Sequence, residues 1–578
     1  MCGIFMILSK SGVFTKEVVE KVLTNFKKLK ARGPDSYSLT IVDGCLIGFQ
    51  RLAINDTSKK GMQPFQHNDT FTICNGEIYN YHNLLATHPS LNNKLVSKSD
   101  CEILPHLFHI YGVFQAATML DGVFAIARYN KATQCITLLR DRLGVKPIFH
   151  AENDEFFAVA SETKALDGLS FTNIQPLLPG TISTYSLKHN EMIMTETYTS
   201  IPSIPYVPSE KNDKNDKNEK NEKNDKDDKD DKNEKNDEKN ENYTKNKETT
   251  EYRECVKKVH DVLVESVQKR MTSDRDIGCL LSGGLDSSVV AAILVKEMAK
   301  QGKVLRTFSV GFPDSTDIVY AREVAKHIGS EHHEYIIQYE EALPRISDVI
   351  RAIETYDTTT IRASTPMFLL CEWINKNFPD KVIFSGEGSD ELFCGYLYFH
   401  NAPTAKDAHL DSIRLLNELH LYDVLRADRC TAGNGLEFRE PFLDKNLIDF
   451  VVRMNPQFNI PTMLCDQIKF EKTILREAFE SYLPSNVAWR RKAAFSDAVS
   501  SSQKPWYKWI QEYVDSPEIK DKITDHGGTS ESNYYKTLFY SYFQDYRPTI
   551  QLWLPRWSGD MKGEPSATAL NVYNKEEH

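Results

Sequence analysis

The sequence has no apolar run near the ~18–20 residues that a membrane-spanning helix needs. Its first residues also lack the basic start and the long apolar stretch of a signal peptide. Its 11 cysteines are an odd number, and no two of them form a C-x-x-C pair. A disulfide framework and a zinc site are therefore not indicated, and a reducing compartment fits best. These absences predict a cytoplasmic protein without a membrane partner.

An excess of positive charge is missing as well, because 70 Lys and Arg stand against 81 Asp and Glu. The formal net charge of −11 argues against an electrostatic surface for nucleic acid. What the chain does have is 578 residues, of which 40% are hydrophobic and 11% aromatic. That length is too great for a single core, so the sequence predicts a globular protein of two or more domains.

The plainest boundary is a stretch from about Ser209 to Thr250 that is rich in Lys, Asn, Asp and Glu. With almost nothing apolar to offset chain entropy, such a segment is predicted to be disordered and solvated. We therefore expect a domain at residues 2–205, a low-complexity linker insertion at 206–250, and a second domain at 251–578.

The two halves differ in their hydrophobic patterns. In the first half, a helical stripe from Val18 ends at the turn "RGPD", and "FTICNGEIYN", "GVFAIARYN" and "CITLLRD" are typical of strands. In the second half, "IGCLL", "VLRTFSVGF" and "KVIFSGEGSDELF" are apolar strands that enter glycine or polar loops, with helical stretches between them. That alternation predicts a parallel α/β sheet.

The chain opens with "MCGIF", which places a thiol directly behind the initiator methionine. Most cysteines are small buried hydrophobes, so position alone does not assign a function. Removal of Met1 would, however, leave Cys2 with a free α-amine, titrating near ~7.7–8.0, beside a thiol near ~8.5. An N-terminal amine is able to act as base for an adjacent nucleophile.

A second motif runs from Ser282 to Ser288 as "SGGLDSS", between an expected strand and an expected helix. Its two glycines allow close approach of the backbone, and the helix N-terminus and three hydroxyls supply hydrogen-bond donors for an anion. The loop is neither a Walker loop nor G-x-G-x-x-G, so we expect a phosphate or pyrophosphate site of a different nucleotide chemistry.

Several motifs together carry a family resemblance over nearly the whole chain. "MCGIF", "RGPDS", "QRLAI", "NGEIYN" and "SDCEI" resemble the glutaminase domain of class II amidotransferases, and "LLSGGLDSS" resembles the pyrophosphate loop of ATP-pyrophosphatases. With "YDTTTIRASTPM", "FSGEGSDELFCGY" and "LEFREPFLD", they resemble the glutamine-hydrolysing asparagine synthetases. The resemblance implies an α/β fold: an N-terminal nucleophile hydrolase-type αββα sandwich, followed by a parallel-sheet, adenine nucleotide hydrolase-like domain.

For the first domain, the resemblance implies that Cys2 attacks the side-chain amide of glutamine and forms a thioester. Asn75 and Gly76, expected at a turn after the strand "FTIC", match the oxyanion hole, where loss of one donor typically costs ~10²–10³ in rate. Arg51 matches the clamp on the glutamine α-carboxylate, a task that suits a planar bidentate donor. The implied glutamine-binding positions are Arg51, Leu52, Ala53, Ile54, Asn55, Asn75, Gly76, Glu77 and Asp100.

For the second domain, the resemblance implies that ATP adenylates the β-carboxylate of aspartate, giving asparagine, AMP and pyrophosphate after ammonia attacks. The catalytic carboxylate implied is Glu387 of "SGEGSDE", and Asp286 and Asp390 are plausible Mg²⁺ ligands, since that ion prefers oxygen. The implied ATP-binding positions are Leu280, Ser282, Gly283, Gly284, Asp286, Ser287, Ser288, Val310, Ser385, Gly386 and Lys472. The expected partners are the small molecules glutamine, aspartate and ATP, with a homodimer left open.

Two features depart from the family pattern. Glu440 in "REPFLD" occupies a place that is usually apolar, so we expect it to point outward or to have a basic partner. The charged insertion lies where relatives have a short connection.

Three alternatives remain open at this point: an enzyme like the β-lactam synthetases, a non-catalytic scaffold protein, and a glutamine phosphoribosyl amidotransferase. The complete set of Cys2, Asn75, Gly76 and Arg51 argues against the first two, and "SGGLDSS" does not fit the third.

Overall fold

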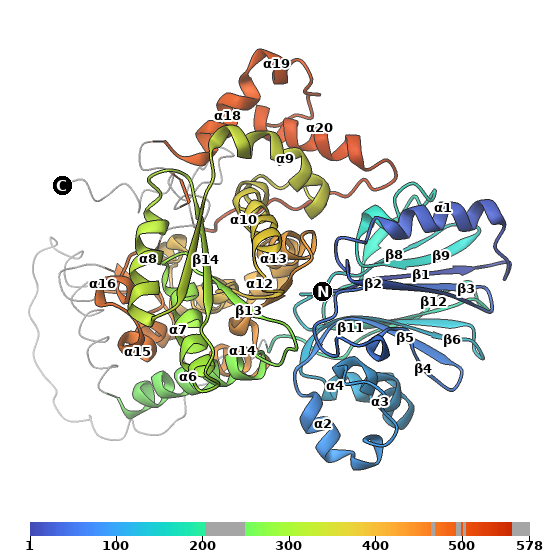
Figure 1. The fold of residues 1–578 in the computed structure, drawn as a ribbon. Coiled ribbons are helices and arrows are strands. Elements are labelled where there is room, and N and C mark those ends of the chain that lie inside the picture. Colours follow the sequence, from blue (N-terminus) through green and yellow to red (C-terminus); the bar gives the residue numbers. More distant parts are fainter. Residues whose placement is uncertain (203–248, 464–468, 493–498, 501–503, 558–578) are drawn as a thin grey trace, which may run out of the picture.

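The structure is a computed structural model that describes residues 1–202, 249–463, 469–492, 499–500 and 504–557. The predicted insertion at 206–250 therefore lies outside the described residues, apart from its last two. A β-sandwich and a body built around a parallel sheet lie side by side, and the N-terminus is placed between them (Figure 1). Within the described ranges, none of the helices is both long and apolar enough to span a bilayer.

The N-terminal body contains two antiparallel six-stranded sheets, in the orders β10-β8-β9-β1-β3-β2 and β12-β11-β7-β6-β5-β4. The first sheet comprises β1 (Gly3–Ser9), β2 (Ser36–Val42), β3 (Cys45–Arg51), β8 (Phe149–Glu152), β9 (Phe156–Ala160) and β10 (Ile174–Pro176). The second comprises β4 (Phe65–His67), β5 (Thr70–Ile78), β6 (Gly122–Asn130), β7 (Cys135–Arg140), β11 (Thr181–Ser186) and β12 (Glu191–Thr197). The helices are α1 (Lys16–Lys27), α2 (Tyr81–Thr87), α3 (Ile103–Tyr111) and α4 (Val113–Met119).

Alternating side chains of these strands build three apolar layers, because successive residues point to opposite faces of a sheet. In β1, Ile4 and Met6 pack between the two sheets, whereas Phe5 and Ile7 pack outward with residues of α1. Residues of β5 and β6 likewise divide between the inter-sheet core and a cluster with α3 and α4. The layers are therefore helix, sheet, sheet and helix, which confirms the predicted αββα sandwich.

The C-terminal body is organised by one parallel sheet in the order β15-β14-β13-β16-β17. Its strands are β13 (Ile277–Leu280), β14 (Arg306–Gly311), β15 (Glu331–Ile336), β16 (Val382–Phe384) and β17 (Glu437–Arg439), and β18 (Thr462–Met463) and β19 (Lys469–Phe470) form a separate small sheet. Since β14 and β15 lie on one side of β13 and β16 and β17 lie on the other, the order reverses between β13 and β16. A crevice at the carboxyl ends of such strands is the usual ligand site of this architecture.

Helices surround this sheet (Figure 1), and the predicted strands and the helix after "SGGLDSS" are confirmed. The helix after that loop is α7, and its residues Val289 to Leu294 are all buried. The helices are α6 (Thr250–Lys269), α7 (Leu285–Ala299), α8 (Thr316–Ile328), α9 (Tyr339–Ile353), α10 (Thr358–Asn377), α11 (Ser389–Leu392), α12 (Ala405–Glu418), α13 (Asp423–Ala432), α14 (Lys445–Arg453), α15 (Thr473–Phe479), α16 (Ser485–Ala488), α18 (Trp506–Asp515), α19 (Pro517–Lys520) and α20 (Ser530–Tyr542).

Two candidate active sites

The first candidate site lies at the N-terminus, between the two sheets of the sandwich. The backbone N–H of Cys2 donates to Asn75 Oδ1 at 2.8 Å, which leaves Asn75 Nδ2 as a donor. That Nδ2 is buried and has no hydrogen-bond partner among the residues that the structure describes. The Cys2 thiol lies 3.6 Å from the carbonyl oxygen of Leu52. The candidate nucleophile is therefore hydrogen-bonded, through its backbone, to the residue that carries this spare amide donor.

Two electrostatic effects act on the Cys2 thiol in opposite directions. Burial raises its pKa, while the positive charge of the N-terminus opposes this rise. In the structure Met1 is buried, and its α-amine lies 3.2 Å from the Glu437 carboxylate. The amine nearest the thiol is thus held by a residue of the C-terminal body.

Asn75 and Gly76 lie within β5, so the expectation of a turn after "FTIC" is wrong. β5 continues because it pairs with β6 without a break from Thr70 to Ile78. The φ of Gly76 is +157°, and a Cβ there would lie 2.1 Å from the carbonyl oxygen of Val123. Only glycine allows this approach of the two strands.

Two carboxyl groups and one amide converge beside this site. Asn55 Nδ2 donates to Glu77 at 2.5 Å and lies 3.4 Å from Asp100, which also accepts from the Ile78 N–H at 2.6 Å. Burial raises the pKa of both acids, and the charge of Asp100 raises that of Glu77 further. A cationic α-amine of an amino acid would relieve this repulsion.

Arg51 is buried at the end of β3, where its guanidinium donates to the carbonyl oxygens of Ser58 and Asp56. These bonds hold the following loop, which contains the buried Leu52, Ala53 and Ile54. The Arg51 guanidinium thus donates two hydrogen bonds to carbonyl oxygens of the loop that follows it. The α-carboxylate of a substrate would contact the other N–H groups of the guanidinium.

The second candidate site is a cavity of about 230 Å³ at the carboxyl ends of β13, β14 and β16. Most of the predicted nucleotide-site residues line it: Leu280, Ser282, Gly284, Asp286, Ser287, Val310, Ser385, Gly386, Glu387, Asp390 and Lys472. Gly283 and Ser288 do not. Gly283 has a φ of +72° and shapes the turn, and Ser288 is fully buried in α7. The cavity therefore brings together motifs that are up to about two hundred residues apart.

Two lysines and two aspartates meet inside this cavity. Lys472 Nζ lies 2.7 Å from Asp286 and 2.6 Å from Asp390, and Lys492 Nζ lies 2.6 Å from Asp390. Burial by itself would raise the pKa of Asp390, but the two ammonium groups hold it well below its usual range. Lys492 was missed by the sequence reasoning, although the basic run "RRK" that contains it is typical of phosphate contacts.

Glu387 follows β16 and faces a second residue that the sequence did not reveal. Arg426 of α13 donates to Glu387 at 2.8 Å and to Asp423 at 2.7 Å. Burial raises the pKa of Glu387, Arg426 opposes this, and Asp423 adds to it. A carboxylate in a cavity whose pKa is raised accepts a proton more readily than an ordinary carboxylate does.

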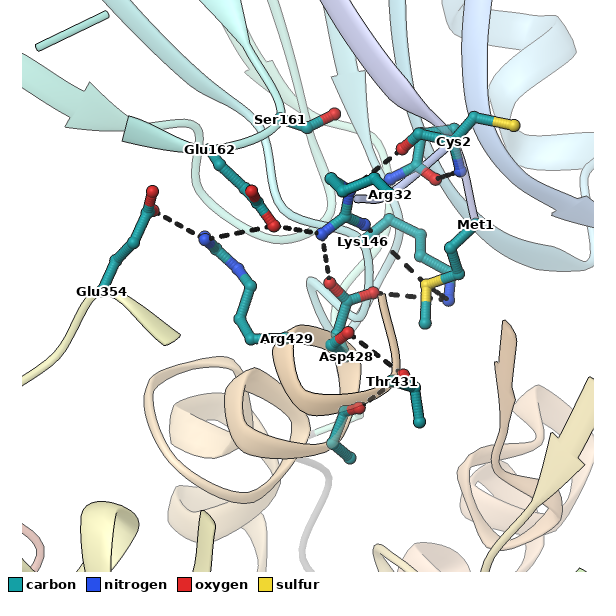
Figure 2. Close-up of polar contacts among 12 residues, drawn as sticks. Met1, Cys2, Arg32, Lys146, Ser161, Glu162, Glu354, Asp428, Arg429 and Thr431 are labelled. Carbon is teal, nitrogen blue, oxygen red and sulfur yellow. Dashed lines mark hydrogen bonds and ion pairs between the residues drawn. The ribbon is translucent and has the colours of Figure 1, made fainter. Parts of the chain in front are cut away.

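Helix α13 contacts both candidate sites, and Figure 2 shows its side chains Asp428 and Arg429 beside Arg32 and Cys2. Arg32 donates to the Cys2 carbonyl oxygen at 3.0 Å, to Glu162 at 2.7 Å and to Asp428 of α13 at 2.9 Å. On the same helix, Arg426 reaches Glu387. This ten-residue helix thus contacts the backbone of Cys2 through Arg32, and it contacts Glu387 directly through Arg426.

The prediction that Glu440 points outward is wrong. Its side chain is 0% exposed, and neither carboxyl oxygen has a hydrogen-bond partner among the described residues. Nor does the structure pair it with a base: within the described ranges, no ion pair includes Glu440. Burial raises the pKa of Glu440 to about 7, against the opposing charges of Lys146, Arg270 and Arg439.

Comparison with known proteins bears on both bodies. The family model described as a glutamine amidotransferase domain matches residues 1–214, and the one described as asparagine synthase matches 258–414 and 403–545. The asparagine synthetase [glutamine-hydrolyzing] of Pongo abelii is 37% identical over 600 residues and covers 99% of each chain. A probable asparagine synthetase [glutamine-hydrolyzing] of Acanthamoeba polyphaga mimivirus is 37% identical over 592 residues, covering 99% of this chain and 100% of its own.

A solved glutamine phosphoribosylpyrophosphate amidotransferase from B. subtilis covers 58% of this chain and 81% of its own, at 15% identity and a TM-score of 0.30. A similarity of that size carries no weight for function. The two synthetase relatives, in contrast, extend across both bodies and both candidate sites.

Proposed function

The chain belongs to the family of glutamine-hydrolysing asparagine synthetases, and from that premise we propose that it makes asparagine from aspartate, ATP and glutamine with the residues described above. The observation that carries the assignment of residues is the hydrogen bond from the Cys2 N–H to Asn75, whose buried Nδ2 has no partner among the described residues.

In the glutaminase half-reaction, we assign the nucleophile to Cys2 after removal of Met1. The freed α-amine takes the thiol proton, and the sulfur attacks the amide carbon of glutamine. Asn75 Nδ2 and the Gly76 N–H hold the negative oxygen that forms, Glu77 and Asp100 hold the substrate amine, and Arg51 holds the substrate carboxylate. The C–N bond breaks, ammonia leaves with the proton from the amine, and water hydrolyses the thioester to glutamate.

In the synthetase half-reaction, the β-carboxylate of aspartate attacks the α-phosphorus of ATP and pyrophosphate leaves. The loop 282–287 and the two lysines, Lys472 and Lys492, balance the charge of the departing phosphates. Ammonia then attacks the acyl-adenylate, AMP leaves, and Glu387 takes the proton that the nitrogen loses. Arg426 holds this carboxylate in place.

The metal in this proposal is Mg²⁺, and the donor set fits it. Asp286 and Asp390 each lie within 2.7 Å of one Lys472 ammonium, so their oxygens already converge on a small cation. When bound, the ion would neutralise phosphate charge there.

The domain division is also part of the proposal. We place the glutaminase domain at 2–205, which contains β12 as its last strand, and the synthetase domain at 251–578, which α6 opens. We further propose a cytoplasmic enzyme, with a homodimer as its candidate assembly.

The test supplies purified protein with aspartate, ATP, Mg²⁺ and glutamine. Asparagine, AMP and pyrophosphate are expected. A Cys2→Ala variant should lose glutamine hydrolysis and keep synthesis from added ammonium, because the synthetase cavity is intact. Release of phosphate rather than pyrophosphate, or loss of both activities in a folded variant, would contradict the assignment.

A further inference from the structure

Residues 544–557 follow α20 and form neither a helix nor a strand, and we call this segment the C-terminal strap. The strap begins on the N-terminal body, where the Asp167 carboxylate accepts from the backbone N–H groups of residues 544–546 at 2.7 to 3.1 Å. In return, the Asp545 carboxylate accepts from the Gly168 N–H at 3.0 Å. Hydrogen bonds to a charged acceptor are stronger than neutral ones, so the start of the strap is firmly attached to that body.

The strap then passes along the synthetase cavity. The hydroxyl of Tyr422, which lines the cavity, donates to the carbonyl oxygen of Gln551 at 3.2 Å. The backbone N–H of Trp553 donates to Asp357 at 3.1 Å. Asp357 also accepts from the N–H of Thr360, a cavity residue at the start of α10, at 2.8 Å. Because both contacts use backbone atoms of the strap, replacing one of its side chains leaves them available.

The strap residue whose side chain lines the synthetase cavity is Trp553. Its neighbours Leu552 and Leu554 are 49% and 55% exposed. The indole packs beside the ring of Tyr396, with the ring centroids 5.5 Å apart, and Tyr396 lines the cavity as well. The strap therefore presents two aliphatic side chains to solvent and one indole to the cavity.

This indole lies in the part of the cavity that contains Glu387. The hydroxyl of Tyr396 donates to Asp423 at 3.0 Å, and Asp423 accepts from Arg426 at 2.7 Å. Arg426 in turn donates to Glu387, the carboxylate that we assign to the step in which ammonia attacks. One ring contact and three hydrogen bonds thus link Trp553 to Glu387.

The polar groups in this part of the cavity attract water, since Glu387, Glu391 and Asp423 are all among its lining residues. An acyl-adenylate reacts with water, and enzymes protect reactive intermediates from hydrolysis by excluding water from the site. An aromatic side chain suits that task because it covers about 150–250 Å² of surface. Trp553 is therefore placed where an apolar wall has a chemical purpose.

We propose that Trp553 closes the Glu387 part of the synthetase cavity and keeps bulk water from the acyl-adenylate. This inference rests on the proposed function, because it presupposes that intermediate. Without the indole, a water oxygen attacks the β-carbonyl carbon in place of ammonia, and the C–O bond to AMP breaks. Aspartate re-forms, AMP leaves, and the proton that water loses passes to solvent. The cleavage of ATP to AMP and pyrophosphate then yields no asparagine.

The test supplies the full chain with aspartate, ATP, Mg²⁺ and saturating ammonium chloride, so that glutamine hydrolysis is not needed. The measured quantity is AMP formed per asparagine formed. This ratio should rise severalfold in Trp553→Ala, because water then competes with ammonia. Trp553→Phe keeps an aromatic wall and should restore a ratio near that of the wild type. A fraction of misfolded enzyme lowers both products together, so the ratio reports the wall rather than folding.

Trp557→Ala is the matched control, since it removes an indole from the same strap. Trp557 packs on Tyr398 and Phe399, with ring centroids 6.0 and 6.2 Å away, and it is not among the residues that line the cavity. Its ratio should stay at the wild-type value. An unchanged ratio in Trp553→Ala, or an equal rise in Trp557→Ala, would overturn the proposal.

A wild type that forms no AMP from aspartate and ATP would instead refute the proposed function. The place of Trp553 would remain testable by acrylamide quenching of its fluorescence, taken as the difference between the wild type and Trp553→Phe. Added ATP should reduce this quenching, because the nucleotide fills the cavity that the indole lines. Quenching that ATP leaves unchanged would contradict the proposal.

Discussion

Glu440 makes a pH-dependent contribution to stability that one substitution isolates. A carboxyl group whose pKa rises from 4.5 to about 7 on folding binds more protons in the folded state than in the unfolded state between these two values. Stability therefore falls as the pH rises through that window. At about 1.36 kcal/mol for each tenfold change, the full penalty above pH 7 is about 3 kcal/mol.

Glu440→Gln removes this penalty and keeps the size of the side chain. The variant should gain up to about 3 kcal/mol relative to the wild type between about pH 5 and pH 8, most of it between about pH 5 and pH 7. Urea unfolding of both proteins across this range gives the difference at each pH. Burying the glutamine amide changes the free energy of unfolding by an amount that does not depend on pH. This amount cancels when the difference between variant and wild type at one pH is compared with the difference at another. A difference that stays constant with pH, or that runs in the opposite direction, would refute the reasoning.

Other predictions address the two half-sites and the insertion. Asn75→Ala should lower kcat for glutamine hydrolysis ~10²–10³-fold, measured as glutamate release, and leave ammonium-dependent synthesis intact; a loss below tenfold would argue against its oxyanion role. Glu387→Gln should abolish aspartate-dependent pyrophosphate release while glutaminase activity survives, and normal synthesis in that variant would disprove the role of Glu387. Deleting residues 210–240 should leave asparagine synthesis within a few-fold and barely change the melting temperature, because the segment is almost devoid of apolar side chains; a collapse of either quantity would reveal a function for it.

The sequence by itself determined the fold class and most of the candidate site. Period-two and helical patterns follow from local backbone geometry, so the strands around Cys74 and Ile126 and the helix after "SGGLDSS" were predictable one segment at a time. Motifs such as "SGEGSDE" are contiguous, and their order along the chain was enough to indicate the family. The turn expected at Asn75 failed because pairing with β6, a partner far along the chain, extends the strand past the polar residues.

Only the tertiary structure decided which distant side chains meet. Arg32 and Asp428 are 396 positions apart and form one ion pair, and nothing in the local sequence of either residue specifies the other. The contact of Arg426 with Glu387 and that of Lys492 with Asp390 are of the same kind. The clearest case is Glu440, since a charged residue in a short apolar motif is compatible with either face of the chain. Its burial, and the lack of an ion-pair partner for it among the described residues, depend on what the rest of the fold places around it, and periodicity carries no information about that.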